Sequence, residues 1–235
     1  MDDGAHYLNF DLSTTEGIET ARKAGLGVSG VADVIITRFL YNAASIFTDT
    51  GHTGRCFTIL RHPIDRAAAV FYSLKRKGVK AIKDMSILEY ANSHVAEDNW
   101  LTRVITNTME GELTQQHCEV AKEVFGRKCL VGFLDNLDKS IERLQKFFMW
   151  EEIKSVNTHH SVMSSTTGKD MAGKRACSRR FVEHGVNRHP GYARVHKGSP
   201  VWAALGKKNK YDIQLYQYAK ALYHQQDVVY AEMTD

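Results

Sequence analysis

Apolar residues recur along this chain with two different spacings. Short runs in which most residues are apolar predict buried strands, because a strand inside a parallel sheet is covered on both faces. Four such runs cover residues 7–12, 31–37, 55–60 and 128–133. Between them, apolar residues recur every three or four positions, which predicts amphipathic helices at residues 13–23, 40–47, 64–76, 87–93, 100–105 and 115–125. Alternating strands and helices predict an α/β fold with a doubly wound parallel sheet, which binds ligands at the carboxyl ends of its strands.

Two more helical patterns occupy the C-terminal half. Their apolar positions are Leu137, Ile141, Leu144 and Phe148, and Tyr211, Leu215, Tyr218 and Leu222. We interpret both stripes as core. The segment between them, residues 151–209, is basic and has no clear apolar period. A segment of this length is either a solvated loop or a lid over a site. If the family resemblance described below holds, such a lid would offer Arg179 and Arg180 to the 3′-phosphate or to a polyanionic acceptor.

The junction at residues 55–66 (RCFTILRHPIDR) is the strongest chemical signal in the chain. The apolar run ends at Arg61, and Pro63 suits the first position of a helix, whose free amide groups attract anions. Arg61 can bind a phosphate there through two charge-assisted hydrogen bonds. The alternative is an arginine that is only solvated or paired with a carboxylate.

These residues carry a resemblance to a known family. Residues 60–63 (LRHP), with Arg66, Phe71 and Tyr72, resemble the 3′-phosphate-binding motif of sulfotransferases, whose sulfuryl donor is 3′-phosphoadenosine 5′-phosphosulfate. Further segments are similar to algal, carbohydrate-type members: residues 13–18 (STTEGI), 98–103 (DNWLTR), 128–133 (KCLVGF) and 209–218 (NKYDIQLYQY). The resemblance implies a P-loop NTPase-like sulfotransferase fold forming one domain over residues 1–235.

The same resemblance implies a function and a site. Arg61 would contact the ribose 3′-phosphate, with His62 and Arg66 beside it. The reaction would transfer a sulfuryl group to a hydroxyl of a carbohydrate-like acceptor, without a metal. The family's catalytic base has no clear counterpart. Asp33 and Tyr41 are weak substitutes, and His62 is better suited to orientation or packing.

The chain departs from the family pattern at two places. The serine that usually follows the arginine by eight residues is Ala69 here, which removes a hydrogen bond worth roughly 1.5 to 3 kcal/mol. Ser73 is our candidate replacement, although it must reach back about 6 Å along the helix. In addition, no strand with a Gly/Ser/Thr/Lys loop for the 5′-phosphosulfate precedes Arg61. We therefore expect an incomplete chain that lacks its first strand and loop. The alternative is a non-catalytic, sulfotransferase-like nucleotide-binding or partner protein.

A second phosphate motif is a decoy. Residues 168–175 (GKDMAGKR) match a Walker loop until Arg175, which stands where Ser or Thr is required, and no apolar strand leads into them. We interpret this stretch as a basic loop, which disfavours a P-loop kinase or NTPase.

Composition adds limits. A chain of 235 residues with 43% hydrophobic and 25% charged residues fits one globular domain. A net charge of +4 suits an anionic nucleotide or an acidic glycan and is too small to indicate nucleic acid. No apolar run approaches the roughly 18 residues of a membrane span. We expect a location in the Golgi lumen if an N-terminal anchor is missing together with the donor loop.

The positions of two of the cysteines suggest that they pack in the core. Cys56 and Cys129 fall inside strand-like apolar runs, and we expect both to be core residues in preference to a disulfide. Cys118 falls in a helical stretch and Cys177 in the basic segment. The four cysteines show no metal-ligand spacing.

Overall fold

The computed structural model describes residues 10–32, 34–47, 54–148 and 192–232, with side chains up to residue 227. The chain is mixed α/β, mostly helical, with a small parallel sheet of two strands. It divides into two compact units, which are described separately. The first contains Met1–Cys56, Asp98–Cys129 and Asn209–Ala221, and the second contains Phe57–Glu97, Leu130–Lys208 and Leu222–Asp235. The expectation of a single domain stays a prediction.

The first unit is helical. Its elements are α1 (Thr15–Lys23), α2 (Leu40–Ala44), η1 (Ser45–Phe47), α5 (Trp100–Thr106), α6 (Gln115–Lys128) and the first half of α10 (Lys210–Glu232). One core forms because α1 and η1 turn their apolar faces toward each other, burying Ile18, Ala21, Leu26 and Ile46. Our expected helices match these elements closely. The predicted helix at residues 13–23 begins at Thr15, and its N-cap is Thr14, whose hydroxyl accepts from the Gly17 amide at 3.0 Å.

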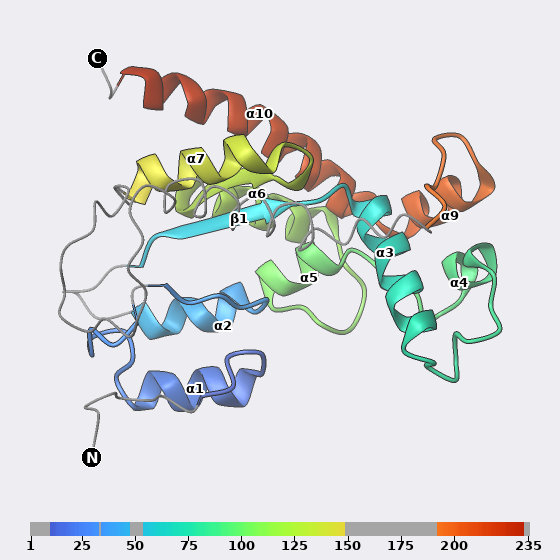
Figure 1. The fold of residues 1–235 in the computed structure, drawn as a ribbon, viewed down its shortest axis with the longest axis horizontal. Helices are drawn as coiled ribbons and strands as arrows, with labels where there is room; N and C mark the ends of the chain where they lie inside the picture. The colour runs from blue at the N-terminus through green and yellow to red at the C-terminus, as the bar shows by residue number, and fades with distance from the viewer. Residues whose placement is uncertain (1–9, 33, 48–53, 149–191, 233–235) are drawn as a thin grey trace, which may run out of the picture. The chain divides into compact units, whose positions relative to one another are not determined.

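The second unit holds the sheet. Its elements are β1 (Cys56–Leu60), α3 (Pro63–Arg76), α4 (Ile87–Asn92), β2 (Cys129–Phe133), η2 (Leu134–Asn136), α7 (Leu137–Phe148), α9 (Pro200–Lys208) and the second half of α10 (Figure 1). The boundary between the units falls at the first residue of each strand. Every residue of β2 is buried, as an apolar run covered on both faces requires. The prediction of strands at residues 55–60 and 128–133 is confirmed.

Two other expected strands are wrong where the structure describes them. Residues 31–32 and 34–37 are irregular, and Val31, Val34 and Ile36 are exposed, Ile36 by 82%. Residues 10–12 form a turn in which the Leu12 amide donates to the Phe10 carbonyl. β-Branched residues favour a strand only when a neighbouring strand supplies backbone partners. In the described ranges only β1 and β2 pair, so a doubly wound sheet is not established.

The expectation that Cys56 and Cys129 form no disulfide is also wrong, although Cys129 is a core residue as expected. Cys56 and Cys129 form a disulfide, with their Cα atoms 4.5 Å apart. The pairing arises because these residues begin the two neighbouring strands β1 and β2. Sequence alone did not show that the two runs are adjacent. Cys118 is a buried free thiol, and its pKa is raised chiefly by desolvation. Cys177 lies outside the described residues.

The C-terminal end of the basic segment, residues 192–209, lies within the described residues. Residues 192–199 are mostly irregular, and the last residues form helix α9, so a structureless segment throughout 151–209 is wrong. Helix α9 packs against α3 and α4 and buries Leu205 completely (Figure 1). Arg179, Arg180 and residues 168–175 lie outside the described residues. None of the described helices combines the length and apolar character needed to cross a membrane.

Helix α4 offers a test of local stability. Its capping box pairs the Ser86 hydroxyl with the Glu89 amide at 3.2 Å and the Glu89 carboxylate with the Ser86 amide at 2.7 Å. The hydrogen bond from the Ser86 amide is the main cause of the lowered Glu89 pKa. The stability that this bond adds to the folded state is therefore present above the ordinary pKa of the carboxyl group and is lost as pH falls through the lowered pKa. We expect Ser86→Ala to lower the free energy of unfolding by about 1 kcal/mol. Urea denaturation measures this, and an unchanged midpoint would contradict it.

Candidate anion site and polar network

The predicted anion site lies between β1 and α3 in the second unit. β1 ends at Leu60, Arg61 follows, and His62 is the N-cap of α3, which begins at Pro63. Arg61 is partly exposed and makes no hydrogen bond or ion pair with any other described residue. Its planar guanidinium can therefore meet a phosphate with its full set of donors.

The first turn of α3 adds amide donors. His62 supplies no side-chain cap, and Pro63 has no amide hydrogen. The amides of Ile64 and Asp65 have no acceptor among the described residues, and the first internal bond runs from Arg66 to the His62 carbonyl. The Asp65 carboxylate lies in the same turn and already complements the helix dipole. Attraction of a second anion must then come mainly from Arg61.

His62 and Arg66 have protein partners. The His62 ring stacks on Trp202 of α9, with centroids 5.1 Å apart and an interplanar angle of 25°. Arg66 Nη1 donates to Glu97 Oε2 at 2.8 Å. Carboxylate pairing, the alternative left open for Arg61, is found instead at Arg66. The neighbouring Tyr90 has a raised pKa, caused first by desolvation and then by the Glu97 charge.

Ser73 lies at the far end of α3. It is ten residues after Pro63, about 15 Å along the helix axis, compared with about 9 Å for Ala69. Helical spacing places Ser73 on the same face as His62 and Arg66. Ser73 therefore shares a face of α3 with His62 and Arg66 but lies far along the helix from Arg61. Its role as a second phosphate ligand stays a prediction.

Sequence reasoning missed Glu97 and Trp202. Glu97 follows α4 in a stretch without a motif, and nothing in its surroundings indicates pairing with Arg66. Trp202 shares α9 with buried Leu205 at a spacing of three, a signal hidden by the flanking bases. Of the proposed substitutes for the base, Tyr41 is 56% exposed on α2 of the first unit, and Asp33 lies outside the described residues.

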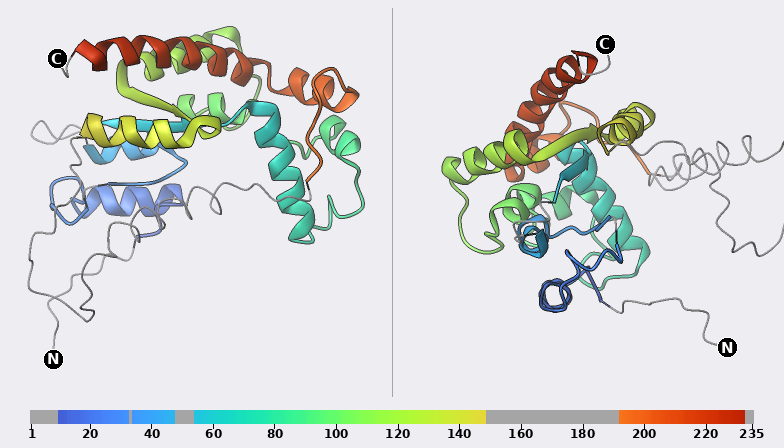
Figure 2. Two further views of the ribbon diagram at one scale, coloured as in Figure 1. Left: turned by 45° about the horizontal axis from the view of Figure 1, so that its top comes forward. Right: turned by 90° about the vertical axis from the view of Figure 1, so that its left-hand side faces the viewer.

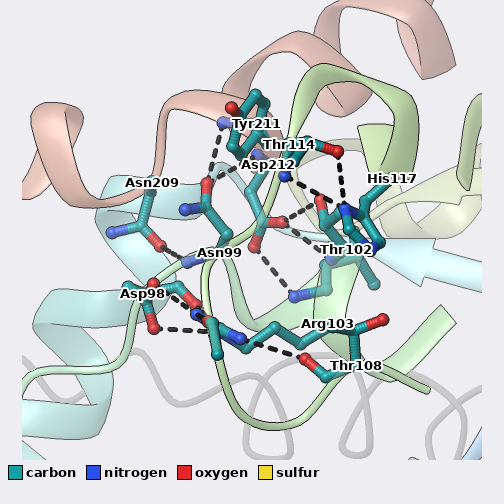
Figure 3. A network of polar contacts seen from close by, with 12 residues as sticks. Asp98, Asn99, Thr102, Arg103, Thr108, Thr114, His117, Asn209, Tyr211 and Asp212 are labelled. Carbon is teal, nitrogen blue, oxygen red and sulfur yellow. Dashed lines mark hydrogen bonds and ion pairs between the residues drawn. The ribbon is translucent and has the colours of Figure 1, made fainter. Parts of the chain in front are cut away.

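The first unit contains a buried polar network (Figure 3). Asp212 of α10 is 2% exposed and accepts three hydrogen bonds from the start of α5. The donors are the Leu101 amide at 2.9 Å, the Thr102 amide at 2.8 Å and the Thr102 hydroxyl at 2.7 Å. Asp212 therefore satisfies α5 amides that the helix itself leaves without acceptors.

Asparagines extend this network between the same elements. Asn99 Oδ1 accepts from the Tyr211 amide at 2.7 Å, and the Asn99 amide donates to Asn209 Oδ1 at 3.2 Å. Asn99 has φ 44°, a left-handed conformation that asparagine tolerates better than most residues. Both asparagines are buried, and their bonds fix the start of α10 to the start of α5.

Arg103 completes the polar cluster. It forms a forked pair with Asp98 at 3.0 and 2.8 Å and donates to the carbonyls of Thr108 and Gly111, each at 3.0 Å. Next to it, the Thr114 amide donates to His117 Nδ1 at 3.0 Å. The polar groups in this network are engaged with one another, so we assign it to folding and not to chemistry.

These two regions are therefore distinct in kind. The charged donors of Arg61 have no partner among the described residues, whereas the polar groups of the network around Asp212 are hydrogen-bonded to one another. No group of three or more His, Cys, Asp or Glu side chains suited to a metal occurs in the described ranges. Searches of family models, curated proteins and solved structures found no match to this chain.

Proposed function

We propose that the chain is a sulfotransferase domain and that Arg61 binds the ribose 3′-phosphate of 3′-phosphoadenosine 5′-phosphosulfate. The observation that carries the proposal is the Arg61 guanidinium at the end of β1, which has no partner among the described residues. The proposal includes a doubly wound, P-loop-like sheet, of which β1 and β2 would be two strands. The acceptor would be a hydroxyl of a carbohydrate-like molecule.

The anion site would contribute binding and orientation. Sulfuryl transfer is an in-line displacement, so a donor fixed by its 3′-phosphate presents its sulfur in one direction. Each charged bond from Arg61 would contribute roughly 1.5 to 3 kcal/mol. The amides of Ile64 and Asp65 would add neutral donors. No described residue is assigned as the base or as the cation at the leaving oxygen.

The disulfide supports the proposed location. Disulfides persist in oxidising compartments such as the secretory pathway and are rare in the cytosol. The Cys56–Cys129 bond therefore fits a protein of the Golgi lumen, where carbohydrate acceptors are modified.

A second candidate is a non-catalytic protein that keeps the nucleotide site. It is favoured by the absence of an assigned base among the described residues. Both candidates predict a preference for a 3′-phosphorylated adenosine, and only the enzyme transfers sulfate.

Calorimetry with adenosine 3′,5′-bisphosphate, ADP and ATP tests the proposal. We expect the bisphosphate to bind more tightly than either of the others, and Arg61→Ala to weaken it roughly ten- to a hundredfold. Arg127→Ala is the matched control, because Arg127 is 74% exposed and its ion-pair partner among the described residues is Glu123, on the same helix. Equal affinity for ADP, or an unchanged Arg61→Ala variant, would contradict the site. A preference for ATP would favour a kinase.

Transfer of labelled sulfate from the donor to a glycan mixture then separates the two candidates. Transfer that is lost in Arg61→Ala supports the enzyme. Tight binding of the bisphosphate without transfer to any acceptor supports the non-catalytic protein.

A further inference from the structure

A second segment of the same unit runs along α3. Near the C-terminal end of α3, Tyr72 stacks on Tyr192 with centroids 4.5 Å apart, and its hydroxyl donates to the Ala193 carbonyl at 3.3 Å. At the N-cap of α3, His62 stacks on Trp202. Residues 192–202 therefore follow α3 in the opposite direction, as Figure 2 shows for the coil that leads into α9.

The contact between His62 and Trp202 lies next to Arg61, the proposed phosphate ligand. His62 follows Arg61 directly, and its carbonyl accepts the first backbone bond of α3, from Arg66 at 2.9 Å. Its imidazole does not cap the helix, so the ring is used for stacking on the indole. Helix α9 is itself held in place by Leu205, which is fully buried. Trp202 thus contacts the N-cap residue of α3 from a packed helix.

We infer that Trp202 is a positioning residue for the anion site. By holding the His62 ring, the indole fixes the backbone at the N-cap and hence the direction in which Arg61 leaves β1. The site is then ordered before the ligand arrives, and binding costs less conformational entropy. This inference rests on the proposed function, because it concerns the same phosphate.

Stacking between aromatic rings predicts the size of the effect. Losing this contact is expected to weaken binding of adenosine 3′,5′-bisphosphate about two- to tenfold. A phenylalanine at position 202 can still stack on the His62 ring, whereas a leucine is apolar but has no ring to stack. Trp202→Leu should therefore weaken binding, and Trp202→Phe should restore most of the affinity.

Calorimetry on the full chain, with melting temperatures measured in parallel, tests the inference. Tyr192→Leu is the matched control, because it removes the other stack between the same two segments. We expect Tyr192→Leu to bind like the wild type. In an Arg61→Ala background, Trp202→Leu should cause no further loss, because Trp202 acts through Arg61. If Trp202→Leu fails to fold, His62→Ala removes the same contact and should cause the same loss.

The outcomes separate the two proposals. Absence of bisphosphate binding by the wild type would overturn the proposed function and this inference together. Binding that is unaffected by Trp202→Leu would overturn only the inference. An equal loss in Trp202→Leu and Tyr192→Leu, or an additive loss in the Arg61→Ala background, would also overturn it, since either result shows general packing and not positioning.

Discussion

Asp212→Ala is expected to lower the free energy of unfolding by about 3 to 5 kcal/mol. The variant removes one carboxylate and leaves the Leu101 amide, the Thr102 amide and the Thr102 hydroxyl without an acceptor. Thr102 is fully buried, so water cannot replace the lost acceptor at its amide without opening the structure. A loss of this size is a large fraction of the 5 to 15 kcal/mol typical of a domain.

Chemical denaturation followed by circular dichroism measures the loss. Asp84→Ala is the control, because Asp84 is exposed and has no partner among the described residues. Asp212→Asn keeps one oxygen acceptor and should fall between Asp212→Ala and the wild type. If Asp212→Ala unfolds at the same denaturant concentration as Asp84→Ala, the buried network does not stabilise the first unit.

Removal of the Cys56–Cys129 disulfide is expected to destabilise the chain by about 2 to 4 kcal/mol. The bond closes a long loop, with 73 residues of sequence separation, and so restricts the unfolded chain strongly. It also links the first residues of the two paired strands. The double variant Cys56→Ser, Cys129→Ser should therefore melt at a lower temperature than the oxidised wild type.

Reductant provides the control for this prediction. Dithiothreitol should lower the melting temperature of the wild type toward that of the double variant, and should leave the double variant unchanged. The bond does not form if reductant leaves the melting temperature of the wild type unchanged under denaturing conditions. It also does not form if all four cysteines of the unreduced protein titrate as free thiols.

Sequence patterns predicted local structure better than pairing between distant segments. The apolar runs at β1 and β2 and the helical period of α3 depend on neighbouring residues, and these elements are present. Residues 31–32 and 34–37 are richer in β-branched residues than β1 but form no strand. A strand requires a partner, and sequence did not identify one. The disulfide was missed for the same reason, because adjacency of Cys56 and Cys129 is a property of the sheet.

The candidate site was predictable in part for similar reasons. Arg61, His62 and Pro63 lie at a strand–helix junction because their positions follow directly from β1 and α3. Their partners come from distant sequence: Trp202 contacts His62, and Glu97 contacts Arg66. The sequence alone could not show whether Arg66 pairs with a carboxylate or binds a phosphate, since an arginine suits both roles equally well.

Helix α10 has a consequence for synthesis of the chain. Its first half supplies Asp212 to the network of the first unit. In the second unit, Gln226 accepts from the Val131 amide of β2 at 3.1 Å, and the Tyr223 ring packs against Phe133. Each unit thus lacks an interior element until α10 has been translated. Folding of either unit is therefore expected to finish only after α10 has emerged from the ribosome, and nascent chains would depend on chaperones until then.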